Sequence, residues 1–388
     1  MNKKLMALAV AGAFAAPASA MAAAEVYGRV VVGVDQYSAT GATAGSTADF
    51  KSRTRVFDSG SRIGFHGMED LGGGLKGVWQ IESGVNVDAG DLVQGGQSGA
   101  GGNTSTYGFA SRDSYGGLQG PWGRVTFGRQ SIYWVSGRLA QSGANYINTD
   151  VSSTGTLGRV APAVARTSNT IAYNSPNFSG ANFTLSYAPG SENAGAGVTD
   201  TNAVKTGLTG RYTGVVYAQV DITSNKDAGT NARKRSGLKG GVGYPYAPGS
   251  MISVMLITAK DENTTAVGGF SAAGDTVKQK GTLVNWEHTM GQNQFLAEFM
   301  KGSDATGCTV ANGCDNTGFT AMMVAWRYLF SKTTSAFVSY NKTSNKDNAT
   351  FDISGGGISS APSSGGSLPN GSAGADPKII AAGVRIHF

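Results

Sequence analysis

Hydrophobic and polar residues alternate along most of this chain, and the pattern is clearest at its C-terminal end, residues 377–388. One face of that segment carries apolar residues, namely Ile380, Ala382, Val384, Ile386 and Phe388. The other face carries Arg385 and His387. A period of two is typical of a β-strand that meets lipid on one side and water on the other. The pattern therefore predicts a strand that crosses a membrane.

Fifteen further segments show this alternation or an enrichment in β-branched residues, which makes sixteen strand candidates, and none shows a helical period. The sixteen candidates are 25–37, 61–69, 75–87, 106–118, 124–131, 166–174, 181–189, 204–213, 215–224, 234–244, 250–259, 276–289, 294–302, 318–330, 333–343 and 377–388. No shift in composition divides them, so we expect one domain.

The connections between these candidates alternate in length. The seven short ones are 70–74, 119–123, 175–180, 213–214, 246–249, 291–293 and 331–332. The eight long ones are 38–60, 88–105, 132–165, 190–203, 225–233, 260–275, 303–317 and 344–376. This alternation fits an all-β fold, a 16-stranded antiparallel transmembrane barrel with long extracellular loops, short periplasmic turns and both termini in the periplasm. A barrel of that size leaves a water-filled lumen.

The first 24 residues read as a secretory signal peptide. Lys3 and Lys4 precede an apolar run at 5–16, and small residues follow it. Cleavage is expected after residue 20, 23 or 24, which leaves a mature domain of about 25–388. The apolar run is too short to span a bilayer, and no later stretch approaches 18 consecutive apolar residues.

Composition agrees with a barrel. Without Lys3 and Lys4, 29 basic residues face 25 acidic ones, a formal charge of +4 that is too small to indicate nucleic-acid binding. Charged residues make up 14% of the chain against about 25% in ordinary soluble domains. The 59 glycines are about twice the average frequency.

The two cysteines, Cys308 and Cys314, lie in a polar loop of a chain that is exported through an oxidising compartment. We therefore expect a small loop disulfide. Two sulfurs with no nearby histidine make an incomplete zinc site, so no metal site and no cofactor are predicted. The sequence leaves open whether carboxylates of the long loops bind a calcium ion.

Several motifs are similar to those of the general, non-specific porins of β-proteobacterial outer membranes. The matching runs are Tyr27-Gly28-Arg29, SRIGFHG at 61–67, EDLGGGLK at 69–76, WQIESG at 79–84, GRVTFGRQ at 123–130, YNSPNF at 173–178 and GVRIHF at 383–388. They span nearly the whole mature chain, and the run from Ser61 to Lys76 is the most specific.

The resemblance implies a homotrimer of barrels in the Gram-negative outer membrane, surrounded by lipid and open to ions and small hydrophilic solutes. It implies that the terminal Phe388 is a signal for the barrel-assembly machinery. It also implies that the third long loop, Ile132 to Ala165, folds inward and narrows the pore. At about 34 residues this loop is longer than a surface connection needs to be.

By the same resemblance, three arginines line one wall of the constriction: Arg62, Arg112 and Arg166. Alternation places Arg62 with Gly64 and His66, on the lumen face. Because Arg112 and its neighbour Asp113 have opposite parity, one of the two must face outward or lie at a contact between protomers. The expected acidic residues are Glu82 and Asp150, and the secondary lumen candidates are Arg29, Asp35, His66, Lys76, Arg138 and Arg159. An arginine-rich neck concentrates anions, so we predict passive diffusion with a weak anion preference.

Two other functions remain open. A substrate-specific channel would need a saturable solute site, for which Tyr133, Trp134 and Tyr146 are candidates. A surface adhesin would explain the signal peptide and the glycines, but not the alternating loops or the terminal Phe388. An enzyme is not expected, because none of the three histidines has a nucleophile and an acid positioned beside it in the sequence pattern.

Overall fold

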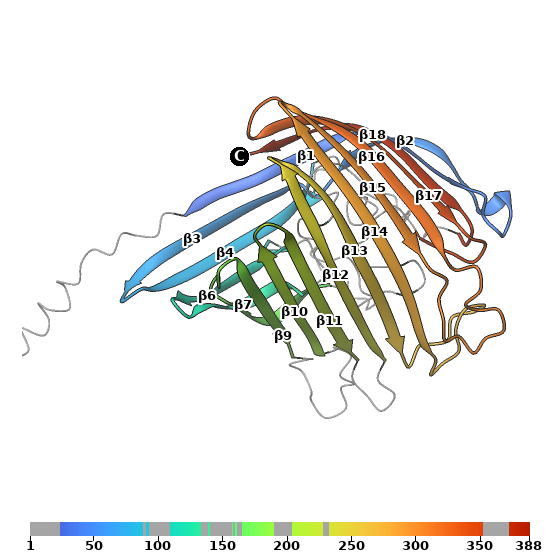
Figure 1. The fold of residues 1–388 in the computed structure, drawn as a ribbon, viewed down its shortest axis with the longest axis horizontal. Coiled ribbons are helices and arrows are strands. Elements are labelled where there is room, and N and C mark those ends of the chain that lie inside the picture. The colour runs from blue at the N-terminus through green and yellow to red at the C-terminus, as the bar shows by residue number, and fades with distance from the viewer. Residues whose placement is uncertain are drawn as a thin grey trace, which may run out of the picture.

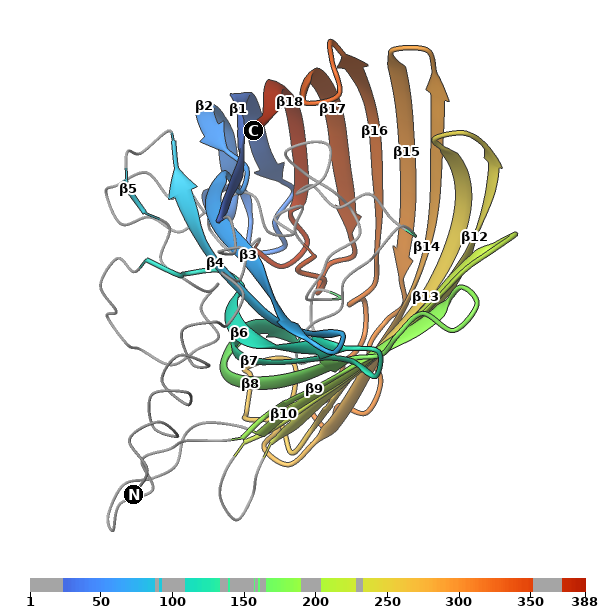
Figure 2. The same ribbon diagram turned by 90° about the vertical axis from the view of Figure 1, so that its left-hand side faces the viewer.

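One antiparallel sheet that closes on itself holds the strands of this protein (Figure 1, Figure 2). The structure, a computed structural model, describes residues 24–87, 91–92, 109–132, 139, 157, 160, 165–189, 204–227, 233–351 and 372–388. Within these residues no helix is long and apolar enough to cross a bilayer. A short 3-10 helix, η1 (Ser46–Ala48), lies in the first loop.

The described strands are β1 (Glu25–Thr40), β2 (Phe50–Asp58), β3 (Arg62–Gly72), β4 (Leu75–Asn86), β5 (Asp91–Leu92), β6 (Ser114–Gly120), β7 (Gly123–Ile132), β8 (Ala165–Asn174), β9 (Ala181–Ala188), β10 (Val204–Thr213), β11 (Tyr217–Lys226), β12 (Lys234–Ala247), β13 (Ser250–Glu262), β14 (Thr276–Met290), β15 (Asn293–Gly302), β16 (Phe319–Leu329), β17 (Thr334–Asn345) and β18 (Asp376–His387).

Two of these strands share one place in the barrel. β2 pairs with the second half of β1, and β3 pairs with the first half, with the break between them at residues 59–61. The two-residue β5 pairs only with the end of β4 among the described strands. With β2 and β3 counted together and β5 set aside, the described strands form the predicted 16-stranded barrel. Among the described strands, the seven short turns fall between the predicted neighbours.

Two differences from the predicted boundaries are larger than the rest. β2 lies inside the segment 38–60 that we expected to be a loop, because its outward residues Ser52 and Thr54 are polar and give no lipid-facing signal. β2 therefore extends the barrel on the extracellular side. The strand expected at 106–118 begins only at Ser114, and residues 109–113 form a turn and a bend before it.

The barrel closes between its first and last strands, which lie side by side near the C-terminus (Figure 2). Phe388 exchanges two backbone hydrogen bonds with Gly28, at 2.9 and 3.2 Å. Its ring lies over Gly28, where a Cβ atom would be 2.4 Å from the ring Cζ. Only a glycine leaves room for this contact, so the C-terminal aromatic residue and the first strand fit each other directly.

Burial follows the predicted alternation. In β18 the outward Ile386 is 41% exposed, whereas its neighbour Arg385, which faces the lumen, is 9% exposed. The same contrast recurs along β13 to β17. An apolar outer face and a polar inner face are what a bilayer outside and water inside require.

Candidate pore constriction

A pair of arginines faces the lumen on neighbouring strands near the closure of the barrel. Arg29 of β1 and Arg62 of β3 are direct partners in the register of the sheet. Both guanidinium groups donate to the carbonyl oxygen of Gly60, at 3.0 Å from Arg29 Nε and 3.3 Å from Arg62 Nε. Like charges directly opposite each other destabilise a sheet, so this pair needs negative charge nearby.

Glu82 of β4 supplies that negative charge. Its Oε1 atom lies 3.4 Å from Arg62 Nη1 and also accepts a hydrogen bond from Arg112 Nε. The other oxygen, Oε2, accepts a hydrogen bond from the Tyr27 hydroxyl at 3.1 Å. Glu82 is only 6% exposed, so these contacts hold it in one place in the wall.

Gly64 makes the contact between Tyr27 and Glu82 possible. Tyr27 is the register partner of Gly64 on β3, and Gly64 is the partner of Glu82 on β4. The Tyr27 side chain therefore passes over Gly64, where a Cβ atom would be 2.3 Å from the ring. The sequence shows the glycine but not the reason for it, which depends on the register of three strands.

Arg112 reaches Glu82 because it lies in the bend before β6 and not in a strand. Residues in a bend do not alternate between faces, so the parity argument against Arg112 does not apply. Its neighbour Asp113 forms a second cluster, in which it binds Arg166 Nε at 2.6 Å and the Ser131 hydroxyl at 2.8 Å. The structure thus divides the three predicted arginines between two acidic residues.

Arg166 lies in β8, three residues before an irregularity at Asn169. The register between β7 and β8 shifts after Gly128, and Asn169 adopts a positive φ of 56°. This β-bulge makes Arg166 the partner of Ser131, while Thr167 is the partner of Gln130. Nearby, Arg129 donates to the Ser111 carbonyl at 3.1 Å and to the Ser168 hydroxyl at 3.0 Å.

Three described residues of the long connection between β7 and β8 lie against the opposite wall. Leu139, Leu157 and Val160 are each 1% exposed and belong to an apolar cluster with inward residues of β13 to β16. Two glycines receive the leucines, since a Cβ atom on Gly241 would be 2.9 Å from Leu139 and one on Gly281 would be 2.8 Å from Leu157. At these points the connection lies inside the barrel.

Gln279 of β14 links this connection to the extracellular loop 303–318. Its Oε1 accepts the Val160 backbone N–H at 3.3 Å, and its Nε2 donates to Ser303 and Thr317 at 3.0 and 3.1 Å. The loop itself is closed by a disulfide between Cys308 and Cys314, with a Cα to Cα distance of 5.6 Å.

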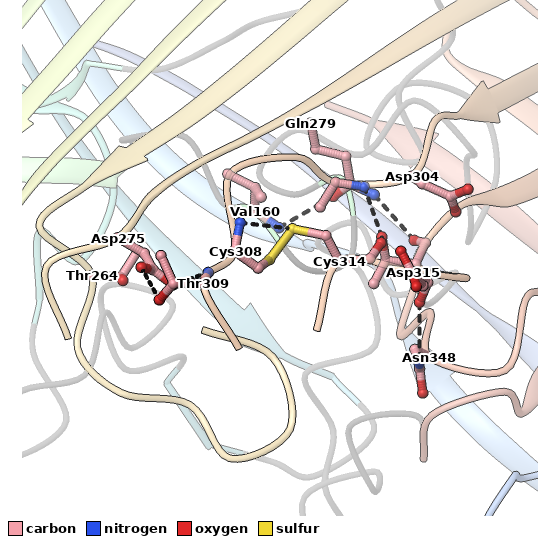
Figure 3. Close-up of a disulfide and its surroundings, with 12 residues drawn as sticks. Val160, Thr264, Asp275, Gln279, Asp304, Cys308, Thr309, Cys314, Asp315 and Asn348 are labelled. Carbon is pink, nitrogen blue, oxygen red and sulfur yellow. Dashed lines mark hydrogen bonds between the residues drawn. A yellow bond between two sulfur atoms is a disulfide. The ribbon is translucent and has the colours of Figure 1, made fainter. Parts of the chain in front are cut away.

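Figure 3 shows this disulfide between Gln279 on one side and the pair Asp275 and Thr309 on the other. The Thr309 backbone N–H and hydroxyl both donate to Asp275 and hold the pKa of its carboxyl below the usual value. Among the described residues, no three His, Cys, Asp or Glu side chains gather as metal ligands do.

The remaining predicted residues lie apart from Glu82. Asp35 faces the lumen and binds Arg55 of β2 at 2.8 Å. His66 is 3.4 Å from Glu25 near the periplasmic end, and Lys76 is the register partner of Asp70 beside the first short turn. Six further candidates lie outside the described residues: Asp150, Arg138, Arg159, Tyr133, Trp134 and Tyr146.

Sequence reasoning missed Tyr27, Asp113 and Arg55 as charge partners. Tyr27 lies in the Tyr27-Gly28-Arg29 motif and Asp113 adjoins Arg112, but the partners of both depend on cross-strand register, which the sequence does not show. Arg55 lies in β2, within the segment 38–60 that the sequence predicts to be a loop. Its signal is present in the sequence, since Arg53, Arg55 and Phe57 alternate with Ser52, Thr54 and Val56.

Comparison with known proteins adds to this geometry. The family model described as Gram-negative porin matches residues 7–348. A major outer membrane protein P.IB of Neisseria gonorrhoeae is 34% identical over 200 residues, which is 50% of this chain and 50% of that protein. The chain thus spans about half the length of that relative. The P.IB protein of Neisseria lactamica is 27% identical over 87% of this chain and 92% of its own length.

Among solved structures, the anion-selective porin from Comamonas acidovorans has a TM-score of 0.69 at 20% identity. That likeness covers 95% of this chain and 100% of the other, and it shows a common fold. The family match extends over most of the chain, and the strands close into a barrel with a polar inner wall. This chain therefore belongs to the Gram-negative porins, the β-barrel channels of the outer membrane.

Proposed function

We propose that this porin lets ions and small hydrophilic solutes diffuse passively across the outer membrane, with a weak anion preference set by Arg62 and Arg112. The observation that carries the proposal is the gathering of three guanidinium groups, those of Arg29, Arg62 and Arg112, around the single carboxylate of Glu82. These four side chains sum to a charge of +2. Arg166 and Arg129 with Asp113 add a charge of +1 in the second cluster.

A net positive wall raises the local concentration of anions and lowers that of cations, and salt screens the effect. The fold comparison supports the sign of this preference, because the neighbour from Comamonas acidovorans is itself described as anion-selective. The leucines of the third long connection, held on the opposite wall, support a lumen that narrows between the two sides. Asp150, Arg138 and Arg159 belong to this connection and complete the proposed constriction.

The proposal includes a homotrimer of mature chains. An OmpT structure from Vibrio cholerae with the same fold is described as a trimer form. We infer that residues 1–24 are removed as a signal peptide and that Phe388 is read by the barrel-assembly machinery. Mass spectrometry of the mature protein would locate the cleavage site, and cross-linking of unboiled protein would give the number of subunits.

Single-channel recording in a planar bilayer tests the function. In a tenfold KCl gradient a channel with ideal selectivity gives a reversal potential of about 59 mV, and we expect a fraction of that value with the sign for chloride. Current steps in groups of three are expected for a trimer. A reversal potential with the sign for potassium would refute the arginine neck.

A specific channel is the second candidate, and one recess favours it. The recess has a volume of about 270 Å³, and its lining combines amide, hydroxyl and aromatic groups, among them Gln80, Tyr115 and Thr184, with the charged Asp113, Arg124 and Arg211. The amide, hydroxyl and aromatic groups suit polyhydroxylated solutes, and the charged groups add further hydrogen-bonding capacity. Saturable flux of one sugar in liposome swelling would favour this candidate, and flux that depends only on solute size would exclude it.

A further inference from the structure

A second group of cations lies at the periplasmic end of the lumen, away from Glu82. A recess of about 300 Å³ opens between β16, β17, β18 and the short turn after β16. Its lining includes Arg327 of β16, Arg385 and His387 of β18, and the hydroxyl residues Ser331 and Ser335. Lys332 of the turn also lines it.

The register explains why these residues meet. Arg385 is the partner of Ser335, so its guanidinium group lies beside a hydroxyl on the next strand. Arg385 Nε lies 2.6 Å from His387 Nε2, which accepts its hydrogen bond. Arg327 lies two register positions from this pair on the far side of β17, where its partner is Phe337.

Positive charge continues from this recess toward the neck. His387 is the register partner of Arg29, and Arg29 is the partner of Arg62. His387 is acted on electrostatically by Arg385, Arg29, Arg327 and Arg62. Four arginines along one wall repel each other, and a bound anion would offset part of that repulsion.

On the other side of the group, the wall carries an amide on β15 and then a carboxylate on β14. Arg327 is the register partner of Gln294 on β15, and the Gln294 amide donates to Glu287 of β14 at 2.6 Å. Glu287 thus has a hydrogen-bond partner on its own side of the wall, and an amide stands between it and the recess.

We propose that this recess binds small divalent oxyanions, with inorganic phosphate as the representative ligand. The planar guanidinium groups of Arg327 and Arg385 present paired N–H donors to the oxygens of a tetrahedral anion. The hydroxyl groups of Ser331 and Ser335 supply further donors, which a monovalent halide uses less well. The recess would be a transient binding site for an oxyanion at the periplasmic end of the pore. Its affinity for the oxyanion must be weak enough to allow release.

The test measures chloride current through the purified, unboiled full-length porin while phosphate is added at pH 8 and constant ionic strength. We expect the current to fall along a saturating curve. Arg385→Gln and Arg327→Gln each remove one guanidinium group from the recess. Each should raise the phosphate concentration at half-saturation about tenfold. Arg327→Lys keeps the charge and loses the fork, so it should lie between wild type and Arg327→Gln.

Lys205→Gln is the control. Lys205 also lies on the inner face of the barrel, but on β10, across from the recess, and it lines neither recess. This variant should keep the wild-type half-saturation. Unchanged half-saturation in both recess variants would overturn the proposal, as would a wild-type current that falls without saturation.

The oxyanion site requires that the barrel conducts ions, as the proposed function states, but it does not require that Arg62 and Arg112 set the selectivity. Arg62→Gln tests the neck through the reversal potential in KCl without phosphate. The recess variants are read from the phosphate curve. If Arg62→Gln keeps the wild-type reversal potential while phosphate still inhibits along a saturating curve, the proposed origin of ion selectivity is refuted and the proposed oxyanion site stands.

Discussion

Opposite changes of charge at one point in the lumen should move ion selectivity in opposite directions. Arg62→Gln removes one positive charge from the group around Glu82, and Glu82→Gln removes its negative charge. Both replacements leave a polar side chain in the wall, equal in length to glutamate and shorter than arginine, and the backbone register is expected to stay. The group falls from +2 to +1 in the first variant and rises to +3 in the second.

The size of the effect follows from distance and screening. An ion that passes about 7 Å from the changed side chain feels about 0.6 kcal/mol in water, and screening at 0.1 M salt reduces this to about 0.3 kcal/mol. Chloride and potassium concentrations then change by a factor of about 1.6 in opposite directions. The permeability ratio of chloride to potassium should therefore change about 2.7-fold, downward for Arg62→Gln and upward for Glu82→Gln.

The assay is the reversal potential in KCl gradients centred near 0.1 M and near 1 M. At 1 M the Debye length is about 3 Å, and the same calculation leaves a change of only about 1.2-fold. Lys278→Gln is the control, because Lys278 lies on the exposed outer face of β14. The reasoning is refuted if both lumen variants shift selectivity in the same direction, or if the shift is as large at 1 M as at 0.1 M.

Three further predictions concern stability. Gly28→Ala should lower the free energy of unfolding by about 1 to 3 kcal/mol, because its Cβ would meet the ring of Phe388. The measurement is the temperature at which the folded form converts to the unfolded form on gels, which should fall. Gly77→Ala, whose Cβ would have its nearest contact 3.8 Å away, should leave that temperature unchanged. Replacing Cys308 and Cys314 by serine should destabilise the closed form of loop 303–318 by about 2 kcal/mol, because the disulfide no longer restricts the open loop. The loop should then be cleaved faster by protease, while channels still form. Equal cleavage rates of the wild-type loop with and without reductant would contradict this. The pKa of Asp275 is lowered in the folded loop, so its contribution to stability is complete above about pH 4 and is lost as the pH falls below that value. An acid-active protease should therefore cleave the wild-type loop at a rate that rises from about pH 4 to about pH 3, with a flatter profile for Asp275→Asn. A wild-type rate that is faster relative to Asp275→Asn at about pH 5 than at about pH 3 would show this reasoning to be wrong.

The sequence predicts the barrel well because the signals of strands and turns are local. Alternation located the strands, and glycines mark short turns such as that between β3 and β4, where Gly73 and Gly74 have φ values of 61° and 81°. β2 escaped because alternation identifies lipid-facing strands, and this strand has polar residues on its outer face.

The candidate site was less predictable, because its contacts depend on cross-strand register. Alternation places Arg62 on the inner face, but it does not show that Glu82 joins Arg62 to Arg112. The bend before β6 and the bulge at Asn169 both break the alternation near the site. Parity is therefore a weak guide where a strand becomes a loop, which is where Arg112, Asp113 and Arg166 of this chain lie.

The proposed function assigns ion selectivity and pore width to different walls of the lumen. Guanidinium groups belong to β1, β3 and the approach to β6, while the leucines of the third long connection are seated on glycines of β12 and β14. A change of charge on the first wall is screened by salt, whereas a change in the apolar seat is not. Under the proposed function, conductance at high salt should therefore report the apolar seat, and reversal potential at low salt should report the arginines around Glu82. The two proposed properties are separable by experiment because salt screens the charge and leaves the packing of the leucines unchanged.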